Sequence, residues 1–476
     1  MKRSILYLSL LVAAITACDR GSLKQNAAPD TRISVTEINL VGEERLRSEV
    51  TLHWLGTDVD GYVTSYELSL DGTNWTEVTS TDSTFNFSLT AGSDTTDIDF
   101  FVRAIDNDGA RDETPAYLLV PIKNSPPTAI FDTVRTLPDT GFVVMTIFFD
   151  VDDSDGANNL DSVFLKLNNG PWYPFEPTVN TVTLVPQDPA FTGITSANVF
   201  VGPQADLLPN AIAGLNLEGD NTFYLKARDA AGAESVVDTS RALFYKRKTS
   251  DLLLVDAHNS GSTPTPEEVY DQALSPLFAS YDRIDLTRDN GANIPQLWIP
   301  TFSFLLELYD KVFWYGSTAE VSILENAAAA VQNYLTGGGK VLISTSFPTD
   351  FDNSSSAITE FTPIDSAFVG LGPRLPLDSL LMPTAAFAAD YDTLEASIFV
   401  GRATPIYVKS IAETIYNGQI FAPASYNGPT AMGALTRNGS GNINMVIVSV
   451  ELQQVYARPQ ELENFFNQVL LNEFNW

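Results

Sequence analysis

The sequence predicts a multidomain fold, in which two antiparallel β-sandwiches are followed by an α/β domain with a doubly wound, mostly parallel sheet. In residues 32–247, short runs of alternating apolar and polar residues are separated by Asp- and Gly-rich turns, and this plan occurs twice. From residue 251 onward, continuous apolar runs alternate with helical patterns, which is typical of strands that are buried on both faces. The length of 476 residues agrees with about three domains.

Residues 1–17 predict a signal peptide. A basic pair, Lys2-Arg3, precedes an apolar run from Ile5 to Ile15, which is too short to span a bilayer of roughly 30 Å. The next residues complete the sequence Ile15-Thr16-Ala17-Cys18, which resembles the bacterial lipobox. That resemblance implies cleavage before Cys18, lipidation of its thiol, and anchoring by two or more acyl chains.

An ordinary signal peptide with an unrelated cysteine is the alternative. Cys18 is the only cysteine in the chain and stands at the cleavage point, so the lipobox interpretation is favoured. Residues 18–31 are polar and lack periodicity, and we expect them to form a lipidated tether. The formal net charge of −32 makes nucleic acid an improbable partner, because such a chain repels phosphate backbones. The expected partners are the membrane, through the lipid anchor, and a glycan or an envelope protein.

The first β-module is predicted over residues 32–123, and the second over residues 124–247. Strands are expected at Val50–Trp54, Tyr62–Leu70 and Asp99–Ile105, and the hairpin and strand motifs recur at Phe164–Trp172 and Tyr224–Asp229. Asn124-Ser125-Pro126-Pro127 joins the modules, and its prolines disfavour both helix and strand pairing. A stretch near residues 188–217 is an insertion with no assigned place. The modules resemble fibronectin type III or immunoglobulin-like modules of bacterial surface proteins, which implies a fold and no function.

The acidic loop at residues 150–155 is the best candidate for a metal site. Asp150, Asp152, Asp153 and Asp155 could supply several of the six to eight oxygen ligands that calcium prefers. The loop lacks the EF-hand spacing, and Asp and Gly also favour turns in which no metal is bound. The turn interpretation is therefore favoured, and no cofactor other than this calcium is expected.

The C-terminal domain is predicted over residues 250–476. Strands are expected at Leu252–Val255, Tyr281–Leu286, Leu308–Tyr315, Lys340–Ser344 and Asn444–Val450, with helices at Thr265–Tyr281, Thr318–Thr336 and Pro459–Asn472. This order, with Tyr309–Trp314 and Gly337–Gly339, resembles the class I glutamine amidotransferase-like superfamily and its ThuA-like relatives. Residues 351–436 match that pattern poorly.

The resemblance implies a catalytic cysteine, histidine and glutamate, and the chain departs from that requirement. Its only cysteine is Cys18, and its two histidines are His53 and His258. A cysteine nucleophile needs a nearby histidine base, so a complete catalytic triad is not expected and the domain is interpreted as degenerate. Whether the protein is an enzyme stays open, and the non-enzymatic interpretation is favoured.

A ligand crevice is expected beyond the carboxyl ends of the parallel strands, at the switch in strand order. The residues at those ends are Asp256, His258, Trp314, Tyr315, Ser344, Ser346 and Glu451. Aromatic rings, hydroxyls and carboxylates would suit a sugar or another polar ligand. A vestigial crevice that is lined by ordinary loop residues is the favoured alternative.

The leading functional prediction is a membrane-anchored envelope lipoprotein that acts as a non-enzymatic binding and scaffold protein, with the β-modules as a spacer. One alternative is a hydrolase-like enzyme that acts on glycans or polar metabolites in the crevice, which requires Asp256, His258 and Glu451 to converge. The other alternative is a structural subunit of an envelope complex. The combination of domains resembles envelope proteins of Bacteroidota, so an outer-membrane lipoprotein that faces the periplasm or the cell surface is expected.

Overall fold

The computed structural model describes residues 25–35, 45–46, 48–87, 89, 93–132, 140–259, 264–287, 297–370 and 372–476. Cys18, the expected signal peptide and the first part of the tether lie outside these residues and stay predictions. The chain divides into two compact units. The first unit comprises Met1–Ala129, Val151–Ser162 and Lys226–Val236, and the second comprises Ile130–Asp150, Val163–Leu225 and Val237–Trp476.

Two antiparallel sheets form the sandwich-like N-terminal module of the first unit. Their orders are β1-β2-β5 and β4-β3-β6-β7. The strands are β1 (Asp30–Val35), β2 (Glu49–Thr57), β3 (Val63–Ser69), β4 (Thr76–Val78), β5 (Asp82–Asn86), β6 (Thr95–Asp106) and β7 (Ala116–Lys123). Side chains alternate between the faces of a strand, so Leu52, Trp54, Phe100 and Val102 gather in one core. The prediction of strands at the positions of β2, β3 and β6 is confirmed.

The second β-module is also built from sandwich-like sheets. One sheet has the order β15-β14-β13-β10-β8 with β16 paired to β14, another has the order β12-β11-β18-β19, and a small one has the order β17-β20-β9. The strands are β8 (Thr128–Phe131), β9 (Thr140–Gly141), β10 (Met145–Asp152), β11 (Leu160–Leu167), β12 (Tyr173–Phe175), β13 (Thr181–Pro186), β14 (Gly193–Val201), β15 (Asp206–Leu207), β16 (Ile212–Leu217), β17 (Gly219–Asn221), β18 (Phe223–Asp229), β19 (Asp238–Thr239) and β20 (Leu243–Tyr245). The insertion near residues 188–217 forms β14, β15 and β16 and extends the first of these sheets.

The C-terminal part of the second unit contains a mixed sheet of order β22-β21-β23-β24-β31-β30-β29-β26-β27. Neighbouring strands are parallel from β22 to β31 and antiparallel from β31 to β27. The strands are β21 (Leu252–Ala257), β22 (Asp282–Asp285), β23 (Lys311–Gly316), β24 (Lys340–Ser344), β26 (Leu380–Pro383), β27 (Leu394–Glu395), β29 (Glu413–Gly418), β30 (Ala431–Arg437) and β31 (Ile443–Val448), and β25 (Ile364–Ala367) pairs separately with β28 (Ile406–Val408). The sheet is therefore less parallel than the sequence predicted, because most of the added antiparallel strands come from residues 351–436.

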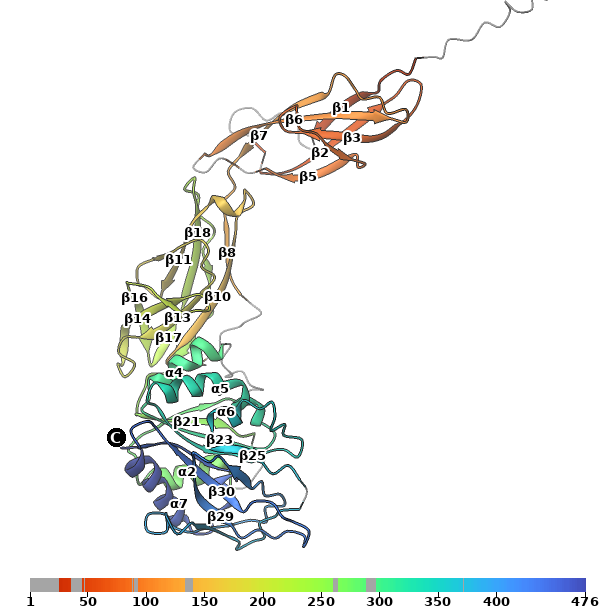
Figure 1. The fold of residues 1–476 in the computed structure, drawn as a ribbon. Helices are drawn as coiled ribbons and strands as arrows, with labels where there is room; N and C mark the ends of the chain where they lie inside the picture. The colour runs from red at the N-terminus through yellow and green to blue at the C-terminus, as the bar shows by residue number, and fades with distance from the viewer. Residues whose placement is uncertain are drawn as a thin grey trace, which may run out of the picture. The chain divides into compact units, whose positions relative to one another are not determined.

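Helices cover both faces of this mixed sheet (Figure 1). Alternate residues of β21 enter two separate cores: Leu252 and Leu254 pack on the side of α2 and α7, and Leu253 and Val255 pack on the side of α4 and α5. The helical segments are α2 (Pro266–Leu274), η2 (Trp298–Phe302), α4 (Ser303–Glu307), α5 (Val321–Thr336), α6 (Ile358–Phe361), η3 (Leu452–Gln454), α7 (Pro459–Phe466) and η4 (Asn467–Glu473), and a short η1 (Ala157–Asn159) lies in the second β-module. Within the described part of the chain, no helix is long and apolar enough to cross a membrane.

Candidate functional site

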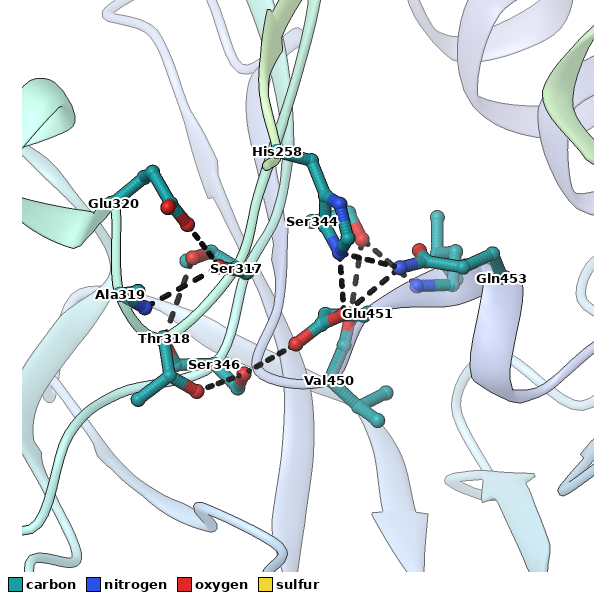
Figure 2. A network of polar contacts seen from close by, with 12 residues as sticks. His258, Ser317, Thr318, Ala319, Glu320, Ser344, Ser346, Val450, Glu451 and Gln453 are labelled. Atoms are coloured by element: carbon teal, nitrogen blue, oxygen red, sulfur yellow. Dashed lines mark hydrogen bonds and ion pairs between the residues drawn. The ribbon is translucent and has the colours of Figure 1, made fainter. Parts of the chain in front are cut away.

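A buried polar cluster lies just beyond the carboxyl ends of β21, β24 and β31, and we call it the strand-end cluster (Figure 2). Parallel pairing places these three strand ends beside the ends of their neighbours, so residues far apart in sequence meet there. The cluster contains His258, Ser346, Glu451 and Gln453, each less than one-tenth exposed. The sequence had placed the first three of these at strand ends.

The Glu451 carboxylate is at the centre of the strand-end cluster. Its Oε2 lies 2.9 Å from Nε2 of His258 and accepts a hydrogen bond of 2.8 Å from Nε2 of Gln453. Its Oε1 accepts a hydrogen bond of 3.0 Å from Oγ of Ser346, which lies 2.8 Å from Oγ1 of Thr318. Each carboxylate oxygen therefore has at least one partner, as a buried charge requires.

His258 is bound to the cluster by one ring nitrogen only. Burial by itself would lower the pKa of His258, but the hydrogen bond and the negative charge of Glu451, with the charge of Asp256, outweigh burial and raise the pKa. The other ring nitrogen, Nδ1, is buried and makes no hydrogen bond within the described residues. The imidazole is thus favoured in its charged form and retains one polar atom without a partner among the described residues.

The carboxylate of Asp256 contacts the backbone of His258. Its Oδ1 accepts a hydrogen bond of 2.9 Å from the backbone N–H of His258, and its Oδ2 accepts one of 2.8 Å from the hydroxyl of Tyr315. Burial raises the pKa of Asp256 to about 7, and the hydrogen bonds from Tyr315 and His258 oppose that rise. The side chain therefore titrates near neutral pH and fixes the start of the loop that carries His258.

Three other predicted site residues, Ser344, Trp314 and Tyr315, are parts of the framework. The hydroxyl of Ser344 donates to the carbonyl of Val450 and accepts from the N–H of Leu452, at 3.2 and 2.9 Å. These bonds hold the turn that carries Glu451. Trp314 is 1% exposed and packs in the core on the α5 side, so its ring offers no face to a ligand. Tyr315 is equally buried on the opposite face of β23.

The order of groups in the strand-end cluster limits its chemistry. A serine nucleophile is activated by a base that accepts its proton, and in a Ser-His-acid triad the histidine stands between the other two. Here Glu451 stands between Ser346 and His258. The sequence interpretation missed Gln453 and Thr318, although Gln453 follows Glu451 by two residues and a turn there would have brought both inward.

One cavity lies elsewhere in the fold. It has a volume of about 510 Å³ and is lined by Asp251, Lys311, Lys340 and Trp476, among other residues. These residues stand near the amino ends of β21, β23 and β24, away from the strand ends that carry Glu451. The ammonium groups of Lys311 and Lys340 already donate to the backbone carbonyls of Leu470 and Trp476. The cavity therefore does not belong to the strand-end cluster.

The candidate calcium ligands divide into two groups. Asp150 and Asp152 are exposed at the end of β10, whereas Asp153 and Asp155 are 3% and 2% exposed. Among the residues that the structure describes, no three His, Cys, Asp or Glu side chains gather closely enough to hold a metal ion. A calcium site here would need other oxygen ligands as well.

No family model matches this chain. No curated protein matches it either. Among similar solved structures are the fibronectin(III)-like modules of Clostridium thermocellum CbhA, with 13% identity over 45% of this chain and 94% of that chain and a TM-score of 0.16. Another is a tetra-tandem repeat in the extending region of a large adhesion protein, with 15% identity over 45% of this chain and 49% of that chain and a TM-score of 0.18. These values are too low to carry an argument, so the sandwich-like description rests on the strand pairing.

Proposed function

We propose that this chain is a membrane-anchored envelope lipoprotein that acts as a non-enzymatic binding and scaffold protein. The observation that carries the proposal is the order Ser346–Glu451–His258, in which the hydroxyl contacts the carboxylate and has no contact with the histidine. A buried charged group with satisfied hydrogen bonds suits recognition of a polar ligand better than activation of a nucleophile. The two β-modules precede this domain in the chain and would act as its spacer.

The relation to the class I glutamine amidotransferase-like superfamily is part of the same proposal. Parallel strands β22, β21, β23, β24 and β31, with helices on both faces, support it. The antiparallel extension from β30 to β27 and the absence of any cysteine after Cys18 in the sequence speak for a degenerate member. The fold would then be kept as a frame for binding, without the family's covalent chemistry.

Anchoring through Cys18 is tested by fractionation and surface digestion. Cys18→Ala should move the protein from the membrane fraction to the soluble fraction, because one cysteine carries all of the proposed acylation. Digestion of intact cells with a protease should remove the protein if its body faces outward, and protection would place it in the periplasm. An unchanged membrane fraction for the Cys18→Ala variant would contradict the lipid anchor.

Binding is tested with the full chain in detergent on an array of glycans. His258→Ala should weaken capture of any glycan that is bound at the strand-end cluster, because it removes the ring that carries the free Nδ1. The matched control is Glu413→Gln, on β29, which changes an exposed pair with Arg437. Capture that both variants retain in full would place the binding surface elsewhere, and no captured glycan would reject glycan as the ligand.

A hydrolase-like enzyme is the second candidate, and one observation favours it. The side chains of His258 and Glu451 lie within hydrogen-bond distance of each other, and Asp256 accepts a hydrogen bond from the backbone N–H of His258. Incubation with a panel of glycosides and esters separates the two candidates. Turnover that falls at least 100-fold in both His258→Ala and Glu451→Gln, but not in Glu413→Gln, would establish the enzyme and overturn the non-enzymatic proposal.

A further inference from the structure

The first compact unit contains a second buried polar cluster, which we call the join cluster. It consists of Asn124, Ser125, Asp153, Asp155, Asn159 and Asp229. Asn124 and Ser125 lie in the join between the β-modules, and the other members belong to two loops of the second module. Five members are less than one-tenth exposed, namely Ser125, Asp153, Asp155, Asn159 and Asp229, and Asn124 is partly buried.

Hydrogen bonds tie the join to both loops. The backbone N–H of Ser125 donates to Oδ2 of Asp155 at 2.6 Å, and Nδ2 of Asn124 donates to Oδ2 of Asp229 at 2.5 Å. Nδ2 of Asn159 donates to Oδ1 of Asn124 at 3.1 Å and to Oδ2 of Asp153 at 3.3 Å. These contacts link the six residues into one hydrogen-bonded cluster.

Among the described residues, no cationic side chain balances the negative charge of the join cluster. Asp153, Asp155 and Asp229 are buried, and within the described residues none of them forms an ion pair with a lysine or arginine. The nearest cationic side chains in sequence, Lys226 and Arg228, contact Glu234 and Asp161 instead. Three buried carboxylates without a cation are costly.

Three oxygen atoms of the cluster also lack partners. They are Oδ1 of Asp155, Oδ1 of Asn159 and Oγ of Ser125, all buried and without a hydrogen bond. An acidic turn accounts for Oδ1 of Asp153, which accepts from the N–H of Asp155, but it does not account for these three atoms. Buried oxygens without donors are the groups that a cation would satisfy.

We propose that the join cluster binds calcium, with ligands from Asp153, Asp155, Asn159 and Ser125. Carboxylate, amide and hydroxyl oxygens are ligands that calcium accepts, and its flexible coordination allows backbone carbonyls or water to complete the shell. Only two carboxylates bind directly, so the site does not require three acidic side chains at one point. Asp229 is not a direct ligand; it accepts the hydrogen bond from Asn124 and contributes negative charge near the ion. The bound ion ties Ser125 of the join to the loop at residues 153–159.

A similar set of hydrogen bonds precedes the first module, but it differs from the join cluster in the burial of its acids. Nδ2 of Asn26 donates to Oδ2 of Asp106 at 2.5 Å, and the N–H of Ala27 approaches the Asp60 carboxylate at 3.3 Å. These contacts repeat those of Asn124 and Ser125. However, Asp60 is exposed, so water can satisfy it without an ion. In this first copy Oδ2 of Asp58 is also buried without a hydrogen bond, but only the second copy buries both acids of its loop, Asp153 and Asp155.

The test is calcium titration of the full chain, purified in detergent and freed of metal with a chelator. Calorimetry should show saturable binding with a dissociation constant on the order of 10⁻⁴–10⁻³ M, the range of extracellular modules. Asp155→Asn should weaken it at least tenfold. The matched control is Asp152→Asn, which makes the same change at an exposed carboxylate three positions earlier and should leave binding within twofold.

Folding of the variants is followed separately in chelator by circular dichroism. Asp155→Asn should be no less stable than the parent without calcium, because it removes repulsion between buried acids. If it does not fold, Ser125→Ala serves in its place, since it removes one hydroxyl and should also weaken binding. The proposal is overturned if calcium fails to bind, if binding survives Asp155→Asn or Ser125→Ala unchanged, or if Asp152→Asn weakens it equally. Ordered water would then be the group that satisfies these oxygens.

Discussion

Replacing Glu451 with glutamine tests whether the strand-end cluster contains a stabilising ion pair. The change keeps the shape of the side chain and removes the charge that faces His258 at 2.9 Å. Both side chains are about one-tenth exposed. Removal of one partner from a buried pair costs about 3–5 kcal/mol. Glutamine can still accept the hydrogen bond from Ser346, so we expect the lower end, about 3 kcal/mol.

The loss should depend on pH in one direction. Because the pKa of His258 is raised in the folded chain, its protonated form is stabilised there. That contribution is fully present below the pKa of an unfolded histidine, about 6.5, and is lost as the pH rises through the folded pKa. The destabilisation by Glu451→Gln should therefore be about 3 kcal/mol near pH 5.5. It should fall to about 1 kcal/mol near pH 9, where only a hydrogen bond remains.

Hydrogen exchange of the β24 and β31 amides in the full chain measures this local stability. Exchange is compared at both pH values after correction for the intrinsic rates. Glu413→Gln is the matched control: it breaks an exposed pair with Arg437 on the same sheet and should cost less than about 1 kcal/mol. An equal loss at the two pH values, or a loss no larger than that of the control, would refute the assigned ion pair.

Three further perturbations test the framework. Burial raises the pKa of Asp256 to about 7, so the stability of the wild-type protein should decline as the pH rises from about 4 to 7. Asp256→Asn should abolish that decline, which thermal unfolding at several pH values measures. A decline of unchanged size in the variant would contradict this assignment. Trp54→Ala should cost about 3–5 kcal/mol, seen as lost exchange protection in β2 and β6 with β31 unaffected. Thr265→Ala removes the side chain that caps α2 in a capping box with Glu268 and should cost about 1 kcal/mol in its first turn; unchanged exchange there would exclude the cap.

Most of the fold prediction came from the local pattern of apolar and polar residues along the chain. Alternating burial in β6 and the fully buried run of β21 both follow from the sequence, because each strand's pattern reports how many faces it buries. The antiparallel extension was not predicted, because β26 and β27 are short and pair with partners distant in sequence. Short strands show little periodicity, and their register depends on contacts that the sequence does not display.

The strand-end cluster could be predicted in part for a related reason. Asp256 lies near the end of β21, and His258 and Glu451 follow β21 and β31, so the topology brings these residues together. Trp314 was expected at the crevice but points into a core, because a strand buried on both faces packs each side chain into one core or the other. The hydrogen-bond order around Glu451 depends on side-chain geometry, which strand assignment alone does not give.

The hydrogen bonds at the proline-rich join have a practical consequence for expressing pieces of this protein. Asn124-Ser125-Pro126-Pro127 looks like the natural place to separate the modules. However, the first compact unit continues across it to residues 151–162 and 226–236. A fragment that begins after the prolines would leave Asp155 and Asp229 without the donors Ser125 and Asn124. Its acidic loops would be opened to solvent, and poor behaviour of such a fragment would reflect the chosen boundary and not an intrinsic instability of the module.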